Sequence, residues 1–484
     1  MNVFTNLHPE KIWHYFSEIV CVPRPSKKEQ KIINYLVKFA EEQKLQYKVD
    51  AAGNIIIYKP AAKGLENKET VILQSHVDMV CEKNADTHHD FLSDPIIPYV
   101  DGDWVKAKGT TLGADDGIGV AAMMAVLSDN TLQHGPLECL FTVDEETGLT
   151  GAFELSPDVL TGKILINLDS EDEGELFIGC AGGKDTAITF PLELKREINS
   201  SDSSYLISVT GLRGGHSGDD IHRGYGNAIK IMSEILNDLA KQLSININRF
   251  EGGNLRNAIP REAFAAIKVS GADKPEILKY FETIQTNLPE KWKAVEPGLK
   301  ISYDPVTDPE YYLEPGFQQK LLDALLECPN GVIAWSKEIK DLVETSTNLA
   351  SIKFIEGKHI EITTSQRSAS DSAKNEIAEK VAQVFKARGG EAIHSKGYPG
   401  WKPNTSSKLV KITANSYRSL FKQEPLVKAI HAGLECGLFL EKYPDLDMIS
   451  FGPTIKGAHS PDERLHIPSV KKFWDLLIDV LQKV

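Results

Sequence analysis

The sequence predicts an α/β fold, in which a mostly parallel sheet carries helices on both faces and a separate α+β domain is inserted. Short β-branched runs alternate with helical patterns in the first 185 residues. Near residue 186 this alternation gives way to longer strands and helices, and it returns after about residue 393. Strand–helix alternation of this kind builds a largely parallel sheet that helices cover on both faces.

Each element of the first segment is predicted from its apolar spacing. In residues 8–20 and 27–43 the apolar side chains recur at intervals of three and four residues, as they do in amphipathic helices. The near-continuous apolar stretch 117–129 is expected to be a buried helix. Apolar runs bounded by charge or glycine predict strands over residues 53–59, 70–80, 137–146 and 163–169.

The middle of the chain has a different pattern. Strands are expected over residues 203–211, 245–252, 263–271, 348–357, 359–368 and near 391–397, and helices over 226–243, 275–288 and 371–390. The last segment is expected to add helices over 407–421, 434–443 and 470–483 and a strand over 447–453. The simplest architecture is a catalytic domain formed by residues 1–185 and 394–484, with a lid or dimerisation domain inserted over 186–393.

Composition excludes several classes of partner. The apolar content of 41% and charged content of 25% are ordinary for a globular protein. A net charge of -14 argues against nucleic acid or an anionic membrane as partner, since both attract clustered positive charge. The six cysteines are scattered, the N-terminus shows no signal peptide, and no apolar run is long enough to span a bilayer. These features lead us to expect a cytoplasmic protein with free thiols.

Ionisable residues gather where predicted strands end. His76 and Asp78, the pair Glu145–Glu146, and Asp169 each follow a strand, and His459 follows the strand expected over 447–453. Ligands of open α/β sheets collect at such strand ends. Asp115 lies just before the buried apolar helix.

Taken singly, each of these features has an ordinary explanation. A histidine at a strand end, an acidic pair in a turn and an aspartate before a helix are usually structural or solvated residues. Their convergence is harder to explain by a hydrophobic core, because unpaired buried charge is costly. The five potential ligands His76, Asp115, Glu146, Asp169 and His459 suit zinc, manganese or cobalt. A two-metal site also needs a shared carboxylate and a proton shuttle, for which consecutive carboxylates can divide the roles.

Nine segments resemble one metallopeptidase family, which contains the Xaa-His dipeptidases, carnosinases, peptidase T and carboxypeptidase G. These segments are HVDMV, GTTLGADDGIG, DEETGLTGAF, NLDSEDEGELFIGCAGG, GGHSGDDIH, NLRNAIPREAFA, GYPGWKP, HAGLECGLF and GPTIKGAHSPDERLHI. They span essentially the whole chain. The HAGLECG and NLRNAIPRE segments resemble the Xaa-His dipeptidase branch in particular.

The resemblance implies a role for each metal-site residue. Asp115 is implied to bridge two divalent ions per chain, zinc being expected and cobalt or manganese being alternatives. His76 and Asp169 would complete one site, and Glu146 and His459 the other. Glu145 is implied to be the general base, and Asp78 to orient the His76 ring. The peptide bond between Asp115 and Asp116 is expected to be cis.

The resemblance also implies four substrate contacts: His216, Asn257, Arg367 and Gly433. His216 would polarise the scissile carbonyl, within one chain or across a homodimer. Asn257 and Arg367 would hold the substrate's carboxylate, and Gly433 would offer a backbone contact. On the residues alone, His216 is as well explained by a structural hydrogen bond, and Arg367 by a surface strand position.

The expected activity is hydrolysis of short peptides, above all Xaa-His dipeptides including carnosine-like substrates. Three alternatives remain open: a related two-metal tripeptidase, an acyl-amino-acid amidase, and a non-catalytic scaffold of the same fold. The chain contains no G-x-S-x-G segment of the kind that serine hydrolases use.

Overall fold

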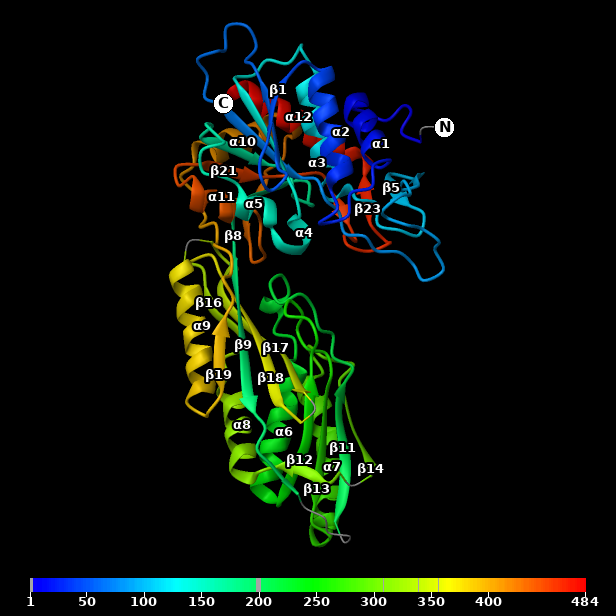
Figure 1. Cartoon of the computed structure of the whole chain (residues 1–484), viewed down its shortest axis with the longest axis vertical. Helices are drawn as coiled ribbons and strands as arrows, with labels where there is room; N and C mark the ends of the chain where they lie inside the picture. Colours follow the sequence, from blue (N-terminus) through cyan, green and yellow to red (C-terminus); the bar gives the residue numbers. More distant parts are fainter. Residues whose placement is uncertain (1–2, 197–201, 308, 338, 356) are drawn as a thin grey trace. The chain divides into compact units, whose positions relative to one another are not determined.

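A computed structural model describes residues 3–196, 202–307, 309–337, 339–355 and 357–484 (Figure 1). The chain forms two compact units. Unit 1 comprises Met1–Cys180, Trp401–Ala429 and Leu434–Val484, and unit 2 comprises Ala181–Gly400 and Ile430–Gly433. The predicted fold class is confirmed, whereas the domain limits drawn from the sequence stay a prediction.

Unit 1 is built on an eight-stranded sheet in the order β1-β2-β6-β3-β7-β21-β8-β20. The strands are β1 Gln46–Val49, β2 Ile55–Lys59, β3 Val71–His76, β6 Leu137–Thr142, β7 Ile164–Asn167, β8 Glu175–Cys180, β20 Leu426–Ile430 and β21 Asp447–Ser450. The pairs β3–β6, β3–β7 and β7–β21 are parallel, and β1–β2, β2–β6 and β8–β21 are antiparallel. The sheet is therefore parallel at its centre, as the sequence predicts, and antiparallel outside.

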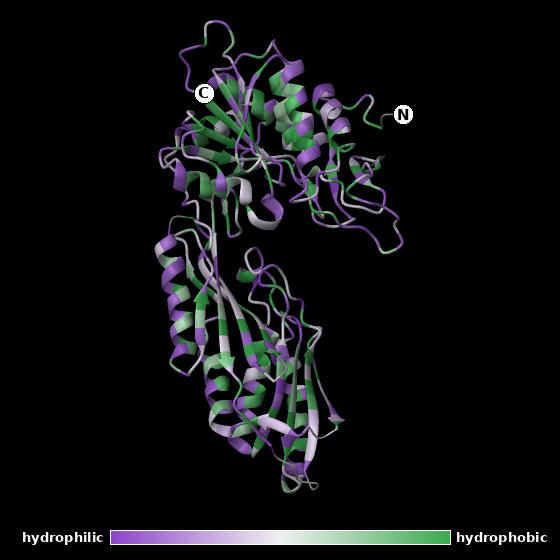
Figure 2. Cartoon of the chain, in the orientation of Figure 1, coloured by the Kyte–Doolittle hydropathy of each residue, from purple (hydrophilic) through white to green (hydrophobic). Residues whose placement is uncertain are grey.

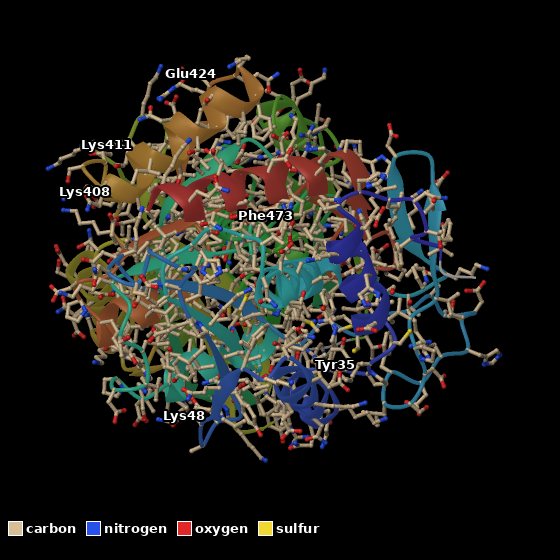
Figure 3. The ribbon with its side chains drawn as sticks, turned by 90° about the horizontal axis from the view of Figure 1, so that it is seen from above. Tyr35, Lys48, Lys408, Lys411, Glu424 and Phe473 are labelled. Atoms are coloured by element: carbon tan, nitrogen blue, oxygen red, sulfur yellow. The ribbon has the colours of Figure 1, made fainter. Side chains whose placement is uncertain are left out.

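Helices cover this sheet in two groups. The helices of unit 1 are α1 Glu10–Ile19, α2 Gln30–Glu42, α3 Ala114–Ser128, α4 Glu145–Gly148, α5 Thr150–Glu154, α10 Lys408–Phe421, α11 Cys436–Lys442 and α12 Ile467–Lys483. The α3 helix is buried from Ala114 to Leu127, as its apolar sequence predicts, and it packs on β3 and α1. The α12 helix packs on α10. Figure 3 shows Lys408 and Lys411 at the outer edge of unit 1, whereas Phe473 of α12 is buried.

A second, four-stranded sheet in unit 1 has the order β22-β23-β5-β4. Its strands are β4 Pro98–Asp101, β5 Trp104–Ala107, β22 Ile455–Lys456 and β23 Arg464–His466. The antiparallel pair β22–β23 forms a hairpin, and β23 pairs with β5. This hairpin, which the sequence pattern did not predict, carries the segment from Gly457 to Glu463.

Unit 2 is an antiparallel sheet with helices. Its main sheet has the order β14-β11-β13-β12-β17-β18-β9-β19, with β16 beside β17, and β10 pairs with β15. The strands are β9 Gly182–Pro191, β10 Leu194–Arg196, β11 Ser203–Thr210, β12 Ile245–Gly252, β13 Ala263–Val269, β14 Lys300–Val306, β15 Tyr311–Leu313, β16 Gly331–Trp335, β17 Val343–Ile355, β18 His359–Ser368 and β19 Glu391–His394. The helices are α6 Ala228–Gln242, α7 Lys274–Trp292, α8 Pro315–Glu327 and α9 Asp371–Lys386.

Helix formation in unit 2 follows local rules. Asn227 caps α6 by accepting hydrogen bonds from the amides of Ile229 and Lys230. The α9 helix buries Ile377, Val381 and Phe385 on one face, and its remaining surface is largely polar (Figure 2). Among the helices of the described residues, none combines the length and the apolar character that a bilayer span requires.

Candidate metal centre

The β3 strand ends at His76, whose imidazole is buried in unit 1. Its Nδ1 lies 3.2 Å from the carbonyl oxygen of Asp78 and 3.4 Å from the Asp78 carboxylate. The same carboxylate accepts hydrogen bonds from the amides of Glu145, at 3.0 Å, and Glu146, at 3.2 Å. The Asp78 carboxylate therefore contacts both the His76 ring and the turn that carries the two glutamates.

Asp115 lies between two histidines. One carboxylate oxygen is 3.2 Å from Nε2 of His76, and the other is 3.1 Å from Nε2 of His459. Asp115 and Asp116 have non-helical backbone angles at the start of α3, and the peptide bond between them is cis, as expected. Asp115 thus presents one oxygen to each side of the cluster.

Glu145 and Glu146 follow β6 after a sharp change in chain direction. Asp144, between the strand and α4, has a φ of 52°, a left-handed conformation that is costly for a residue with a side chain. A carboxylate oxygen of Glu146 lies 3.0 Å from Nε2 of His459. Glu145 lies within 4.8 Å of both His76 and Glu146, measured between their possible ligand atoms.

Asp169 and His459 complete the cluster from two different sheets. Asp169 follows β7, and its carboxylate is 3.3 Å from Nε2 of His76. The prediction that His459 follows the strand around residues 447–453 is wrong in detail. That strand ends at Ser450, and His459 lies in the β22–β23 hairpin with a φ of 61°. The five residues therefore come from the ends of three strands, a helix start and a hairpin.

Four groups of possible metal-ligand side chains occur in the described residues, and two of them share Asp115. His76, Asp115 and Asp169 form one group, and Asp115, Glu146 and His459 form the other. In each group the possible ligand atoms all lie within 4.8 Å of one another. All five residues that the sequence singled out as possible ligands are thus brought together in unit 1, with Asp115 shared.

Carboxyl groups outnumber positive charges around the cluster. Burial raises the pKa of Asp169 to about 7, against the opposing effect of His76. Burial also raises the pKa of Glu145 well above its usual range, and the charges of Asp169 and Glu146 add to this effect. Hydrogen bonds to Asp115 and Glu146 raise the pKa of His459 to about 11. Added positive charge would therefore stabilise the ionised carboxylates of the cluster.

The donor set fits divalent metal ions. Imidazole nitrogen and carboxylate oxygen, without thiolate, suit zinc, manganese and cobalt. One carboxylate oxygen of Glu146 is buried without a hydrogen-bond partner among the described residues, and so is one of Asp116. Buried polar atoms in native structures nearly always have a partner. A cation bound beside Asp115 would provide a partner for the Glu146 oxygen.

The four predicted substrate contacts all lie in unit 2. Nη2 of Arg367, on β18, is 3.5 Å from Nε2 of His216, and Nη1 donates to the hydroxyl of Tyr398 at 3.2 Å. A Cβ on Gly433 would lie 2.9 Å from the Tyr398 ring. Arg367 thus contacts both His216 and Tyr398, and Gly433 lies against the same tyrosine. Asn257 is exposed, and its carbonyl oxygen accepts from the amide of Ser217 beside His216.

Three buried charged residues near the metal centre were not predicted: Arg24, Glu435 and Glu463. Glu435 accepts hydrogen bonds from Gln74 and Thr142 beneath the strand ends, and burial raises its pKa to about 8. Arg24 and Glu463 contact the loop before α3. The available signal was the position of Glu435 and Glu463 inside the HAGLECG and HSPDE segments, but a buried role cannot be read from short segments alone.

The fold and the centre agree with a family assignment. The model of peptidase family M20/M25/M40 matches residues 72–483, and the chain belongs to this family. It is therefore a peptidase of that class.

Two full-length relatives place the chain more narrowly within the family. It is 44% identical over 490 aligned residues to the cytosol non-specific dipeptidase of Escherichia coli (strain K12), covering 100% of this chain and 99% of the relative. The crystal structure of an aminoacylhistidine dipeptidase from Vibrio alginolyticus matches with a TM-score of 0.90 and 42% identity, covering 99% of this chain and 98% of that one. The aminopeptidase PepT of Bacillus cereus shares the fold, with a TM-score of 0.57 at 17% identity over 99% of both chains.

Proposed function

We propose that this chain is a two-metal dipeptidase whose substrates include dipeptides with a C-terminal histidine, such as carnosine-like β-alanyl-histidine. The observation that carries the proposal is that two ligand groups share Asp115. The names of the two full-length relatives support the choice of dipeptides, and the second supports a C-terminal histidine. A cytosolic location accords with the name of the first relative.

The proposed ligands divide as the geometry suggests. His76 and Asp169 would hold one ion and Glu146 and His459 the other, with Asp115 between them. Two such ions lower the pKa of a water molecule and polarise the carbonyl that it attacks. Zinc is the expected ion, and cobalt and manganese suit the same donors.

Glu145 is proposed to move the protons of the reaction. It would accept a proton as the water oxygen attacks the peptide carbonyl carbon, and it would donate a proton to the amine as the C–N bond breaks. Burial raises its pKa, so this carboxyl group holds a proton more readily than an exposed glutamate does. The Asp78 carboxylate holds the Glu145 amide and hence the position of this base.

In unit 2, Arg367 and Asn257 are proposed to bind the substrate's carboxylate, and Gly433 to contact it through the backbone. The Arg367 side chain is buried and held by a hydrogen bond to Tyr398, so its guanidinium has a fixed orientation in which to bind a planar carboxylate. His216 is proposed to polarise the scissile carbonyl, either within one chain or from a partner in a homodimer.

A substrate panel tests the proposal. The purified protein would be assayed with carnosine, Gly-His, Leu-Ala, a tripeptide and an N-acetyl amino acid, before and after chelation and after zinc is restored. We expect turnover of Gly-His and other dipeptides that is lost on chelation and recovered with zinc.

The other outcomes separate the alternatives. Turnover of the tripeptide alone, or of the acetylated amino acid alone, would replace the proposal with a tripeptidase or an amidase. Absence of turnover on every His-terminal dipeptide would contradict the histidine preference. Turnover that survives complete chelation would contradict a metal mechanism, and absence of any turnover in metal-loaded protein would favour a scaffold.

A further inference from the structure

We propose that Glu463 and Arg24 are positioning residues that clamp the loop of Asp115 in place before any metal ion binds. Neither residue belongs to the two ligand groups described above. The inference rests on the proposed metal ligands, and it concerns how their loops are held.

Glu463 holds the loop through its amide groups. One carboxylate oxygen accepts from the amides of Leu112, at 2.7 Å, and Gly113, at 2.9 Å. The other accepts from the amides of Ala114, at 2.7 Å, and Asp115, at 3.2 Å. The first amides of a helix have no partner within that helix. Here one carboxylate supplies a partner for four consecutive amides, ending at the shared ligand.

Arg24 holds the same loop through a carbonyl group. Its guanidinium donates to the carbonyl oxygen of Gly113, and also to those of Val77, at 3.0 Å, and Asp78, at 2.8 Å. Arg24 is 2% exposed. The segment that follows His76 is therefore connected by one buried side chain to the segment that carries Asp115.

The surroundings of Arg24 leave little room for movement. A Cβ on Gly113 or on Gly117 would lie 2.6 Å from its Nη2 atom. Both glycines are thus required where the guanidinium passes the start of α3. Close packing of this kind fixes a side chain better than a surface ion pair does.

Glu463 also connects a third ligand segment. It lies in the β22–β23 hairpin four residues after His459, and is 2% exposed. The clamp therefore joins the segments of His76, Asp115 and His459, which belong to two different sheets and a helix start. Holding ligands in place before binding reduces the ordering that the ion must impose.

The first experiment compares two substitutions of buried carboxylates by amides in the full-length protein. Glu463→Gln keeps the size of the side chain but replaces one acceptor oxygen with an NH2 group that faces backbone amides. Glu138→Gln is the matched control. Glu138 is 3% exposed at the amino end of β6, and it accepts from the amides of Thr161 and Gly162 at 3.0–3.1 Å.

Cobalt(II) is the probe, because its visible absorption reports ligand geometry as well as occupancy. We expect Glu463→Gln to weaken cobalt(II) binding by roughly 10- to 100-fold and to change the visible spectrum. Glu138→Gln should lose thermal stability but keep wild-type cobalt affinity and spectrum.

Each outcome bears on a distinct claim. Equal cobalt affinity and spectrum in Glu463→Gln and wild type would overturn the clamp, and so would an equal loss of affinity in Glu138→Gln. If the wild-type protein itself bound no cobalt(II), the proposed metal site would fail instead.

A second measurement needs no variant and remains decisive if Glu463→Gln does not fold. Amide hydrogen exchange in metal-free wild-type protein should show the amides from Leu112 to Asp115 protected. The amides of Glu10 and Lys11 provide an unclamped comparison, because they lie at the exposed start of α1, where the N-cap residue Pro9 makes no side-chain hydrogen bond. Fast exchange of the 112–115 amides in metal-free protein would overturn the inference.

Discussion

The geometry of the candidate metal centre depends on the individual atoms of Asp115. Each of its oxygens faces a different histidine, and its backbone amide is held by Glu463. The sequence indicated Asp115 because it lies just before the buried apolar helix, in a segment that resembles the metallopeptidase family. It could not indicate which oxygen faces which histidine, because that depends on loops brought together from residues 76 and 459.

Glu145→Ala separates proton transfer from metal binding. Only the proposed proton carrier is removed, since none of the five proposed ligands changes. We expect unchanged metal content and a kcat lower by roughly 100-fold or more. Metal analysis and steady-state assay on the same preparation would check this. Wild-type turnover in the variant would remove Glu145 from the role of base.

His431 should contribute a pH dependence to stability. Burial, together with Arg367, lowers its pKa to about 3 from an ordinary value near 6.5, and its Nε2 is paired with Ser346 at 2.7 Å. Below about pH 6.5 the unfolded chain binds a proton here that the folded chain does not. This group therefore lowers the unfolding free energy as pH falls towards 3, by at most about 1.4 kcal/mol per pH unit.

The comparison is between His431→Gln and His222→Gln, since His222 is exposed. Urea unfolding at pH 7, 6 and 5 would give the free energies. The His431 variant should lose less stability between pH 7 and 5 than wild type, and the His222 variant should follow wild type. Parallel curves for all three proteins would show that His431 does not stay neutral in the fold.

At the scale of elements, the sequence predicted best those whose apolar residues form a local pattern. The α3 helix follows from a near-continuous apolar run, and the β18 strand begins with alternating Ile360 and Ile362 and has the limits expected of it. The β22–β23 hairpin and the strands β4 and β5 were missed. They are two to four residues long, and the pairing of β23 with β5 joins residues more than 300 apart in the sequence, so local patterns do not reveal them.

The turn into α3 gives a prediction at this scale. Gly113 has a φ of 69°, and a Cβ there would also lie 2.8 Å from the sulfur of Met79. Gly102 has a φ of 58° but would meet nothing within 4 Å. Gly102→Ala should therefore cost about 1–2 kcal/mol through backbone strain alone, and Gly113→Ala should cost about 1–3 kcal/mol more through crowding. Chemical denaturation would measure both, and equal losses would contradict the packing described around Arg24.

At the scale of the whole molecule, the candidate site residues are divided between the two units. The metal-ligand candidates lie in unit 1, and His216, Asn257, Arg367 and Gly433 lie in unit 2. The sequence predicted a mostly parallel sheet and an inserted domain, because the pattern of strands and helices changes near residue 186 and returns after about residue 393. The long β9 strand, which starts at Gly182 near the beginning of unit 2, was not predicted, and neither was β8 before it.

Complementation tests whether His216 acts across a homodimer. His216→Ala should keep its metal and lose kcat/KM, and Glu145→Ala should lose turnover. If subunits share the residue, mixing and re-associating the two inactive proteins should restore up to about a quarter of wild-type activity. Random pairing makes about half of the dimers mixed, and each mixed dimer contains one intact active site of its two. Absence of any recovery, in a mixture shown to exchange subunits, would place His216 in the same chain as the metal that it serves.

The proposed two-metal centre requires that Asp115 be shared by two cations. Crystals grown with zinc would be measured at the zinc absorption edge for anomalous scattering. Two peaks are expected, one contacting His76 and Asp169 and the other contacting Glu146 and His459, with one Asp115 oxygen beside each. A single peak, or peaks that Asp115 does not touch, would contradict the account.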